Sequence, residues 1–254
     1  MTTLVYLLLA IILVGQGAES ICAQAPKRVP VIIELFTSEG CDTCPPADKY
    51  LQKLAKDQPI AGVEIIPLQE HVDYFDRLGW KDAFSSAQFT NRQGNFYAPF
   101  FKQKEVYTPQ LIVDGSYILR GSDGNKPVVQ AAGRKKGSVE VKITKTGADL
   151  LTAVIKVGDL EISPDDKAVL LIAVTENDLV SKVLAGENKG STFKHMAVTR
   201  YLKSVGPVTT TDGEFAVDVP LGKDWKQNDL NVVAFIQEIQ GRRILGAASL
   251  SLKK

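Results

Sequence analysis

The sequence predicts an α/β domain over residues 27–136, followed by a smaller β-sandwich-like domain over residues 137–254. Two observations predict this division. Buried-strand patterns alternate with helical patterns in the first part, which is typical of α/β proteins. Beyond segment 133–137, which is rich in Gly, Lys and Arg, short strand patterns follow one another between turn residues, as in antiparallel sandwiches.

Residues 1–23 are predicted to form an export signal peptide. The apolar run 4–14 is too short to span a bilayer as a stable helix and lies where the hydrophobic region of a signal peptide belongs. An uncleaved membrane anchor is the alternative. Cleavage after Ala23 predicts a periplasmic or extracellular protein that keeps no contact with the membrane.

The charge and cysteine content of the chain argue against two classes of protein: nucleic-acid-binding proteins and proteins held together by several disulfides. The chain has 30 Lys and Arg against 29 Asp and Glu, spread along its length without a basic patch or acidic block, so no nucleic-acid partner is expected. Of three cysteines, Cys22 would leave with the signal peptide. The remaining pair, Cys41 and Cys44, is too small a set for a disulfide framework. Oligomeric state has no signal in the sequence.

The first domain contains alternating strand and helix patterns. Apolar positions 47, 51, 54 and 55 fall on one helical face, and Asp114-Gly115 is a typical two-residue hairpin turn. The predicted elements are a buried strand at 31–36, a helix from 47 to about 57, a strand at 63–68, a helical region ending near 97, a hairpin of 110–113 with 116–120, and a helix at 126–132.

The second domain is predicted to be mostly strand. Its expected strands are 139–143, 151–157, 168–174, 214–219, 231–239 and 244–252. A helical insert is predicted at about 195–204. For His195 and Arg200, within this insert, a contact between the domains is the favoured role and catalysis is not.

The motif Cys41-Asp42-Thr43-Cys44 follows the first strand and precedes the first helix. Helix N-terminal amides and the helix dipole stabilise a thiolate, so Cys41 is predicted to attack substrates and Cys44 to resolve the mixed disulfide. Two alternatives remain open. The pair can be a structural disulfide in a non-catalytic binding module, or a copper-binding or copper-delivery site together with His71, because thiolates and imidazole suit copper.

Residues next to the cysteines predict a weakly oxidising or reducing dithiol. Glu39, Asp42 and Asp48 place carboxylates around the sulfurs, which disfavours a further negative charge there. Pro45 disfavours helical backbone angles at the preceding residue, so the helix is expected to begin at Pro45 rather than at Cys41.

Five further residues are candidates for the site. Thr108-Pro109 precedes the predicted hairpin, at the place where a thioredoxin-like fold has a cis-proline, and is expected to hold an extended substrate. Glu34 lies within an apolar run; it either carries a proton for thiol exchange or faces solvent or pairs with a Lys. His71 and Asp73 follow the second strand and are candidate accessory residues. No cofactor or metal is required, because the dithiol itself carries the electrons.

Several segments resemble a bacterial family. Residues 31–48 (VIIELFTSEGCDTCPPAD), 71–82, 89–93 and 106–115 are similar to blocks of the exported, thioredoxin-like family known as domain of unknown function 1223. Phe75 stands where a Trp is expected. The resemblance implies a thioredoxin-like domain followed by a β-rich one and supplies no reaction. The sequence therefore predicts an exported thiol–disulfide oxidoreductase-like protein that acts on protein or peptide thiols and disulfides.

Overall fold

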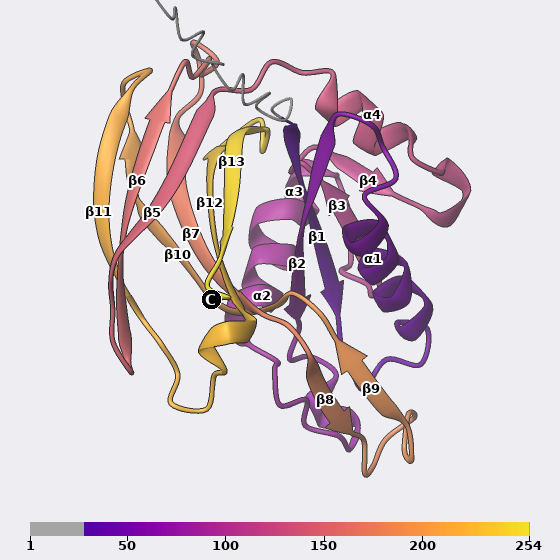
Figure 1. Ribbon diagram of the computed structural model, residues 1–254. Coiled ribbons are helices and arrows are strands. Elements are labelled where there is room, and N and C mark those ends of the chain that lie inside the picture. Colours follow the sequence, from indigo (N-terminus) through magenta and orange to yellow (C-terminus); the bar gives the residue numbers. More distant parts are fainter. Residues whose placement is uncertain (1–27, 254) are drawn as a thin grey trace, which may run out of the picture.

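The structure, a computed structural model, describes residues 28–253, so the predicted signal peptide and Cys22 lie outside the described residues. It is a mixed α/β fold with more strand than helix (Figure 1). The strands are β1 (Val29–Thr37), β2 (Val63–His71), β3 (Gln110–Val113), β4 (Tyr117–Leu119), β5 (Ser138–Thr146), β6 (Leu150–Gly158), β7 (Ala168–Glu176), β8 (Leu179–Lys182), β9 (Thr192–His195), β10 (Val198–Val208), β11 (Gly213–Pro220), β12 (Leu230–Glu238) and β13 (Ile244–Ser251). The helices are α1 (Pro45–Asp57), α2 (Ala87–Asn91), α3 (Ala98–Phe100) and α4 (Lys126–Ala132), with a π-helical stretch, Arg92–Tyr97, between α2 and α3. None of the described helices has the length and apolar character needed to cross a membrane.

One large sheet contains strands from both predicted domains. Its eight strands have the order β13-β12-β7-β10-β2-β1-β3-β4. β1 and β10 are parallel to β2, whereas the other neighbouring strands are antiparallel. The link between the two parts is the pairing of Val198 in β10 with Gln69 in β2. The boundary near residue 137 is therefore not a break in this sheet.

The two faces of β1 have different neighbours, and this positions the candidate site. Val31, Ile33 and Leu35 pack against α1 and α4, whereas Ile32 and Phe36 belong to clusters on the opposite face. The cluster around Ile32 includes side chains of β7 and β12, so the large sheet curves back on itself. Alternation along the strand places every second residue of β1 on the face away from α1.

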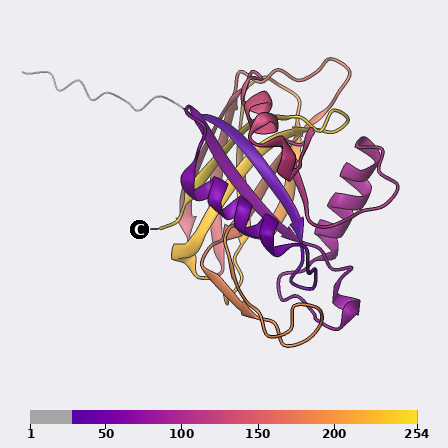
Figure 2. The same cartoon turned by 90° about the vertical axis from the view of Figure 1, so that its right-hand side faces the viewer.

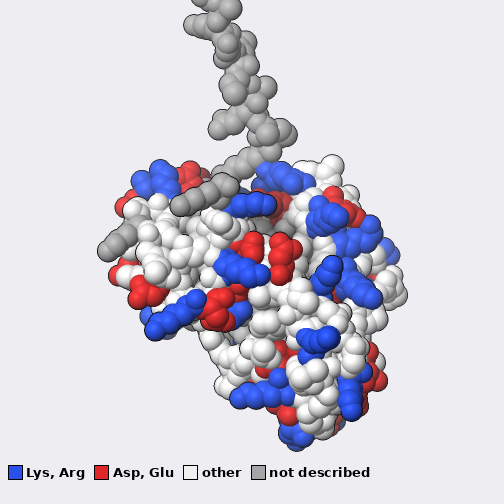
Figure 3. All heavy atoms as spheres, turned by 60° about the horizontal axis from the view of Figure 1, so that its bottom comes forward, with Lys and Arg blue, Asp and Glu red and all other residues white. Residues whose placement is uncertain are grey.

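The β8–β9 hairpin lies at the end of the molecule where β1 ends. Figure 2 shows α1 lying across β1 and β2, with the hairpin below it. A hydrogen bond connects α1 to the hairpin: Nε2 of Gln52 in α1 donates to the carbonyl oxygen of Lys194 in β9, at 2.8 Å. Seen from this end, Lys and Arg side chains stand between stretches of uncharged surface (Figure 3).

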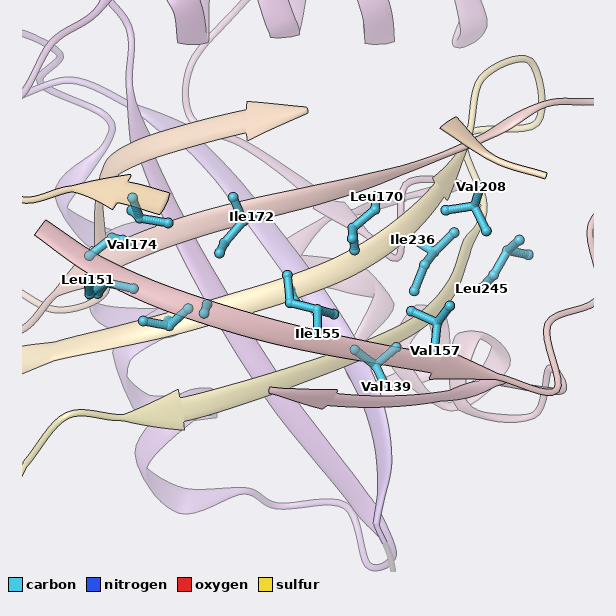
Figure 4. Close-up of a cluster of buried hydrophobic side chains, with 14 of the residues drawn as sticks. Val139, Leu151, Ile155, Val157, Leu170, Ile172, Val174, Val208, Ile236 and Leu245 are labelled. Atoms are coloured by element: carbon cyan, nitrogen blue, oxygen red, sulfur yellow. The ribbon is translucent and has the colours of Figure 1, made fainter. Parts of the chain in front are cut away.

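A three-stranded sheet, β11-β6-β5, packs against the part of the large sheet formed by the C-terminal strands. Leu151, Ala153 and Ile155 alternate along β6 and are fully buried against Leu170 and Ile172 of β7 (Figure 4). Burying one such large aliphatic side chain stabilises a fold by about 1.5–3 kcal/mol. The hydrophobic effect therefore holds these two layers together.

Most predicted elements are confirmed by the structure. The helix begins at Pro45, as predicted from the proline effect, and the hairpin turn at Asp114-Gly115 has φ angles of 52° and 71°. The region ending near residue 97 is broken into α2 and the π-helical stretch rather than one helix. The predicted helical insert at 195–204 is wrong, because β10 forms a strand there.

The physical reason for that error is tertiary. β10 pairs with β7 on one side and with β2 on the other, and it contains the β-branched residues Val198 and Thr199 near its start. Ladder pairing on both sides and burial override the weak local helical pattern. The strands β8 and β9 were not predicted, because four residues each give too short a signal.

Candidate functional site

Cys41 and Cys44 form a disulfide between the end of β1 and the start of α1. Their Cα atoms are 5.4 Å apart, and Cys44 is the N-cap residue of α1 with helical backbone angles. Its carbonyl oxygen accepts hydrogen bonds from the backbone N–H groups of Ala47 (2.9 Å) and Asp48 (3.1 Å). Cys44 thus accepts the first backbone hydrogen bonds of α1.

A cis peptide bond and an apolar cavity lie beside this loop. The Thr108–Pro109 bond is cis, as predicted. Gln110, the next residue, pairs with Phe36 near the end of β1 and so holds the cis-proline beside the strand that leads to the cysteines. A cavity of about 550 Å³ is lined by side chains from the cysteine loop, α1, the cis-proline segment and the β3–β4 hairpin, among them Thr43, Pro46, Tyr50, Pro109 and Leu119. An extended apolar segment would fit against these walls.

The disulfide itself is covered. Cys41 is 1% exposed and Cys44 is 0% exposed. Asn188, in the loop between β8 and β9, donates hydrogen bonds of 2.9 Å from Nδ2 to the carbonyl oxygens of Glu39 and of Cys41. The hairpin loop is therefore bonded to the segment that carries Cys41.

The only two histidines of the chain meet next to this loop, with ring centroids 5.1 Å apart. His71 Nδ1 is 2.6 Å from Asp82 Oδ2, and His195 Nε2 is 2.9 Å from Glu39 Oε1. Trp80 Nε1 donates to the other oxygen of Glu39 at 2.8 Å. The contact predicted for His195 between the two parts of the chain is present, and it ties β9 to the residue two positions before Cys41.

The charge state of this cluster follows from its carboxylates. Burial disfavours the charged form of His71, but the Asp82 carboxylate, with Asp48 and Glu39, outweighs this and raises the pKa of His71. For Asp82, burial acts to raise the pKa, and the nearby His71 reverses this and lowers it. The two groups therefore form a buried ion pair at the end of β2, and Asp82 in turn accepts a hydrogen bond from the backbone N–H of Glu39, which precedes the cysteines.

Asp48 is a buried carboxyl group in the first turn of α1, four residues after Cys44. Because Cys44 has helical backbone angles, a residue four positions later lies on the same face of the helix. Asp48 Oδ1 accepts hydrogen bonds of 2.9 Å from Thr37 Oγ1 and from Gln69 Nε2. Burial raises the pKa of Asp48 above its ordinary value. This group can therefore hold a proton at a pH where an exposed aspartate has lost it.

Glu34 does not have the position predicted for it. It lies on the face of β1 away from α1, where Arg92 Nε is 2.5 Å from its Oε2 and the Tyr97 hydroxyl donates to its Oε1. Alternation along the strand turns its side chain away from the disulfide. It neither faces solvent nor pairs with a Lys; its fully buried carboxylate forms an ion pair with Arg92, whose side chain is 9% exposed.

Glu70 shares this buried cluster and predicts a pH dependence. Burial, and then the neighbouring Glu34, raise the pKa of Glu70 well above its ordinary value of 4.5. Between pH 4.5 and the folded-state pKa, the unfolded chain binds fewer protons than the folded one, so the free energy of unfolding falls as the pH rises. Glu70→Gln removes this contribution. Urea denaturation at pH 5 and pH 8 should show a smaller loss of stability for E70Q than for the wild type, and equal losses would contradict the assignment.

The other predicted residues divide into two groups. Pro109 lines the cavity beside the cysteine loop and Thr108 directly precedes it, and His71 is connected to that loop through Asp82, which accepts a hydrogen bond of 2.8 Å from the backbone N–H of Glu39. Asp73 instead accepts a hydrogen bond of 2.6 Å from Thr90 Oγ1, which connects the segment after β2 to α2. Asn188 and Trp80 were not predicted as site residues. Asn188 in particular has no local signal, since it approaches from 147 residues away.

Within residues 28–253, no three His, Cys, Asp or Glu side chains are grouped so that they could hold a metal ion. Both sulfurs are engaged in the disulfide. Copper binding through Cys41, Cys44 and His71 would therefore need the disulfide to be reduced first.

Fold and site together define a mixed α/β protein with a buried Cys-x-x-Cys disulfide at the start of a helix. The chain belongs to the family described as protein of unknown function (DUF1223), whose model matches residues 32–237. The family resemblance noted in the sequence is thus confirmed. Among curated proteins, none matches this sequence.

Two solved structures share the fold over most of the chain. The crystal structure of protein AGR_C_4864 from Agrobacterium tumefaciens is 25% identical, with a TM-score of 0.66 over 91% of this chain and 97% of that one. HBP35 of Porphyromonas gingivalis is 18% identical, with a TM-score of 0.64 over 89% of this chain and 76% of that one. These similarities extend across both predicted domains and concern the fold.

Proposed function

We propose that this chain is an exported thiol–disulfide exchange protein whose first part works as a thioredoxin-like domain on protein or peptide substrates. The observation that carries the proposal is the disulfide at the N-terminus of α1, next to an apolar cavity that is lined by Thr43 of the cysteine loop and by the cis-proline Pro109. A helix N-terminus favours a thiolate at the end where exchange requires one.

The exchange proceeds in two displacements. A substrate thiolate attacks Cys41 Sγ, the bond between Cys41 and Cys44 breaks, and Cys44 leaves as a thiolate that takes a proton from the Asp48 carboxyl. A second substrate thiol, having lost its proton to solvent, then attacks the substrate sulfur of the mixed disulfide and releases Cys41 as a thiolate. The substrate is oxidised to a disulfide and the protein is reduced to a dithiol; the reverse sequence reduces a substrate disulfide.

The remaining residues have positioning roles. Thr108 and Pro109 hold an extended substrate segment at the mouth of the cavity, with its sulfur directed to Cys41. Asp48 takes the proton-holding role first expected of Glu34, since it lies on the helix face of Cys44 and burial raises its pKa. Cys44 resolves the mixed disulfide when the reaction runs toward substrate reduction.

A second candidate function is a binding module whose disulfide is structural. One observation favours it: both cysteines are buried, with Asn188 bonded across the loop. A structural disulfide has no need of access, whereas exchange requires the β8–β9 loop to move. The two functions therefore differ in whether the disulfide opens reversibly under native conditions.

A redox titration separates the two functions. The Cys22→Ser variant, which keeps one cysteine pair, is equilibrated with reduced and oxidised glutathione. Free thiols are then trapped with an alkylating reagent, and the mass of the protein is measured by mass spectrometry. Exchange predicts a reversible transition, with a potential nearer to about −270 mV than to about −120 mV. A disulfide that stays closed across the glutathione range would support the structural role instead.

Two matched variants assign the roles of the cysteines. Cys44→Ser should accumulate a stable mixed disulfide between Cys41 and glutathione, because no resolving thiol remains. Cys41→Ser should accumulate much less, since Cys44 is the N-cap residue of α1 and its carbonyl oxygen accepts the hydrogen bonds of Ala47 and Asp48 in the first helical turn. Equal trapping by both variants would contradict the assignment of Cys41 as the attacking residue.

A further inference from the structure

The β8–β9 hairpin has one face turned to the redox loop and one turned to solvent. Leu179 pairs with His195, and Ser181 pairs with Phe193, so these four lie on one face, on which His195 contacts Glu39. On the opposite face, Val180 pairs with Lys194 and Lys182 pairs with Thr192, and all four are exposed. The strand period of two therefore separates an anchoring face from a free one.

The free face carries large apolar side chains. Val180 is 63% exposed, and Leu184, just beyond β8, is 67% exposed. The segment against which the hairpin loop packs adds Leu78, which is 50% exposed. The two segments are in contact, since a Cβ placed on Gly186 would lie 3.2 Å from the Cβ of Trp80. Exposed apolar groups gathered beside a candidate site indicate a protein interaction surface.

The charged side chains around these apolar groups are mostly positive. In segments 76–83 and 178–195, the exposed acidic residues are Asp178 and Glu187. The exposed basic residues of the same segments are Arg77, Lys81, Lys182, Lys189 and Lys194. Figure 3 looks at this end of the molecule and shows Lys and Arg side chains, together with some Asp and Glu side chains, among uncharged areas. A partner with an apolar centre and an acidic rim would complement this surface.

We propose that the solvent-facing side of the β8–β9 hairpin, with the adjoining Leu78 segment, is the docking surface for an acidic redox partner protein. The partner's apolar groups contact Val180 and Leu184, and its carboxylates lie near Lys182 and Lys194. Docking there draws the loop of Asn188 away from Cys41 and opens the disulfide to the partner's thiol. This inference rests on the proposed exchange function and names the partner that uses the same site.

Two synthetic cysteine peptides test the docking surface. One has leucines and aspartates around its cysteine, and the other has lysines in place of the aspartates. The rate at which each reduces the Cys41–Cys44 disulfide is divided by its rate with 2-hydroxyethyl disulfide, which corrects for the different reactivity of the two thiols. In low salt we expect the acidic peptide to be favoured about 10-fold, and the preference to shrink in 0.5 M salt.

Variants locate the effect on the hairpin. K182E/K194E should invert the preference between the peptides, and V180S/L184S should slow both of them. Neither double variant should change the rate of reduction by dithiothreitol, which needs no docking surface. Val129→Ser removes an apolar side chain that is 53% exposed on α4, away from the hairpin, and should leave the peptide rates unchanged.

The outcomes distinguish the docking surface from the exchange function. Corrected rates within twofold for the two peptides, or a preference that survives K182E/K194E, would overturn the docking surface, while a reversible titration with glutathione would still uphold exchange. A disulfide that neither dithiothreitol nor glutathione opens reversibly would overturn both proposals together.

Discussion

Replacing Arg92 by Met is expected to lower the free energy of unfolding by about 4 kcal/mol, because it leaves a buried carboxylate without its partner. Arg92 is 9% exposed and Glu34 is 0% exposed, and Nε of the first lies 2.5 Å from Oε2 of the second. The guanidinium also donates from Nη2 to the Tyr97 hydroxyl (3.1 Å) and to Gln237 Oε1 (2.9 Å). One cation thus satisfies groups on β1, on its own helical stretch and on β12.

The measurement is urea denaturation at pH 7, with two comparisons. Lys135→Met removes one partner of the exposed Lys135–Glu161 ion pair and should cause no measurable change. The double variant R92M/E34Q should recover part of the lost stability, since it removes the uncompensated buried charge. If R92M is as stable as K135M, the cluster does not contribute to stability in the way its geometry implies.

The segment around the cysteines could be predicted because its signals are local. The apolar run before Cys41 indicates a strand buried on both faces, and Pro45 sets the first residue of the helix. Pro109 directly before a predicted hairpin strand, in an α/β order of elements, indicated the cis bond that the structure contains. The strand and the helix start depend on residues within a few positions of one another, where periodicity and backbone sterics decide the conformation, whereas the cis bond was inferred from the place of Pro109 in a thioredoxin-like order of elements.

The partners of the site could not be predicted, because they arrive from distant parts of the chain. Alternation along β1 places Glu34 and Leu35 on different faces of the sheet, but it does not show which of the two faces packs against α1. The pairing of Glu34 with Arg92 could therefore not be predicted from the sequence. His195 was placed in a helix, whereas the structure has it at the end of a short strand that is set by pairing with β8. The loop of that hairpin also bonds to the backbone of Glu39 and Cys41 through Asn188. The sequence therefore predicts the cysteine pair but not its burial.

Burial of the disulfide makes the rate of exchange depend on the loop of the β8–β9 hairpin. If the loop must open before a thiolate can reach Cys41, the reaction rate is proportional to the open population. Asn188 holds the closed state with two hydrogen bonds of 2.9 Å to carbonyl oxygens on either side of Gly40. Each such bond contributes about 0.5–1.5 kcal/mol net. Removing both should raise the open population substantially.

Asn188→Ala is therefore expected to increase the second-order rate of disulfide reduction by dithiothreitol about 30-fold, which corresponds to a loss of about 2 kcal/mol from the closed state. The rate is followed by alkylation of the released thiols under native conditions. Asn95→Ala is the matched control, because its side chain bonds only to exposed Asn91 on the helical stretch away from the hairpin. A rate within twofold of the wild type would mean that reductants reach the disulfide from the cavity beside Pro109 instead. Thiol–disulfide exchange would still occur in that case. The measurement therefore tests the route by which a reductant reaches the sulfurs, and not whether exchange takes place.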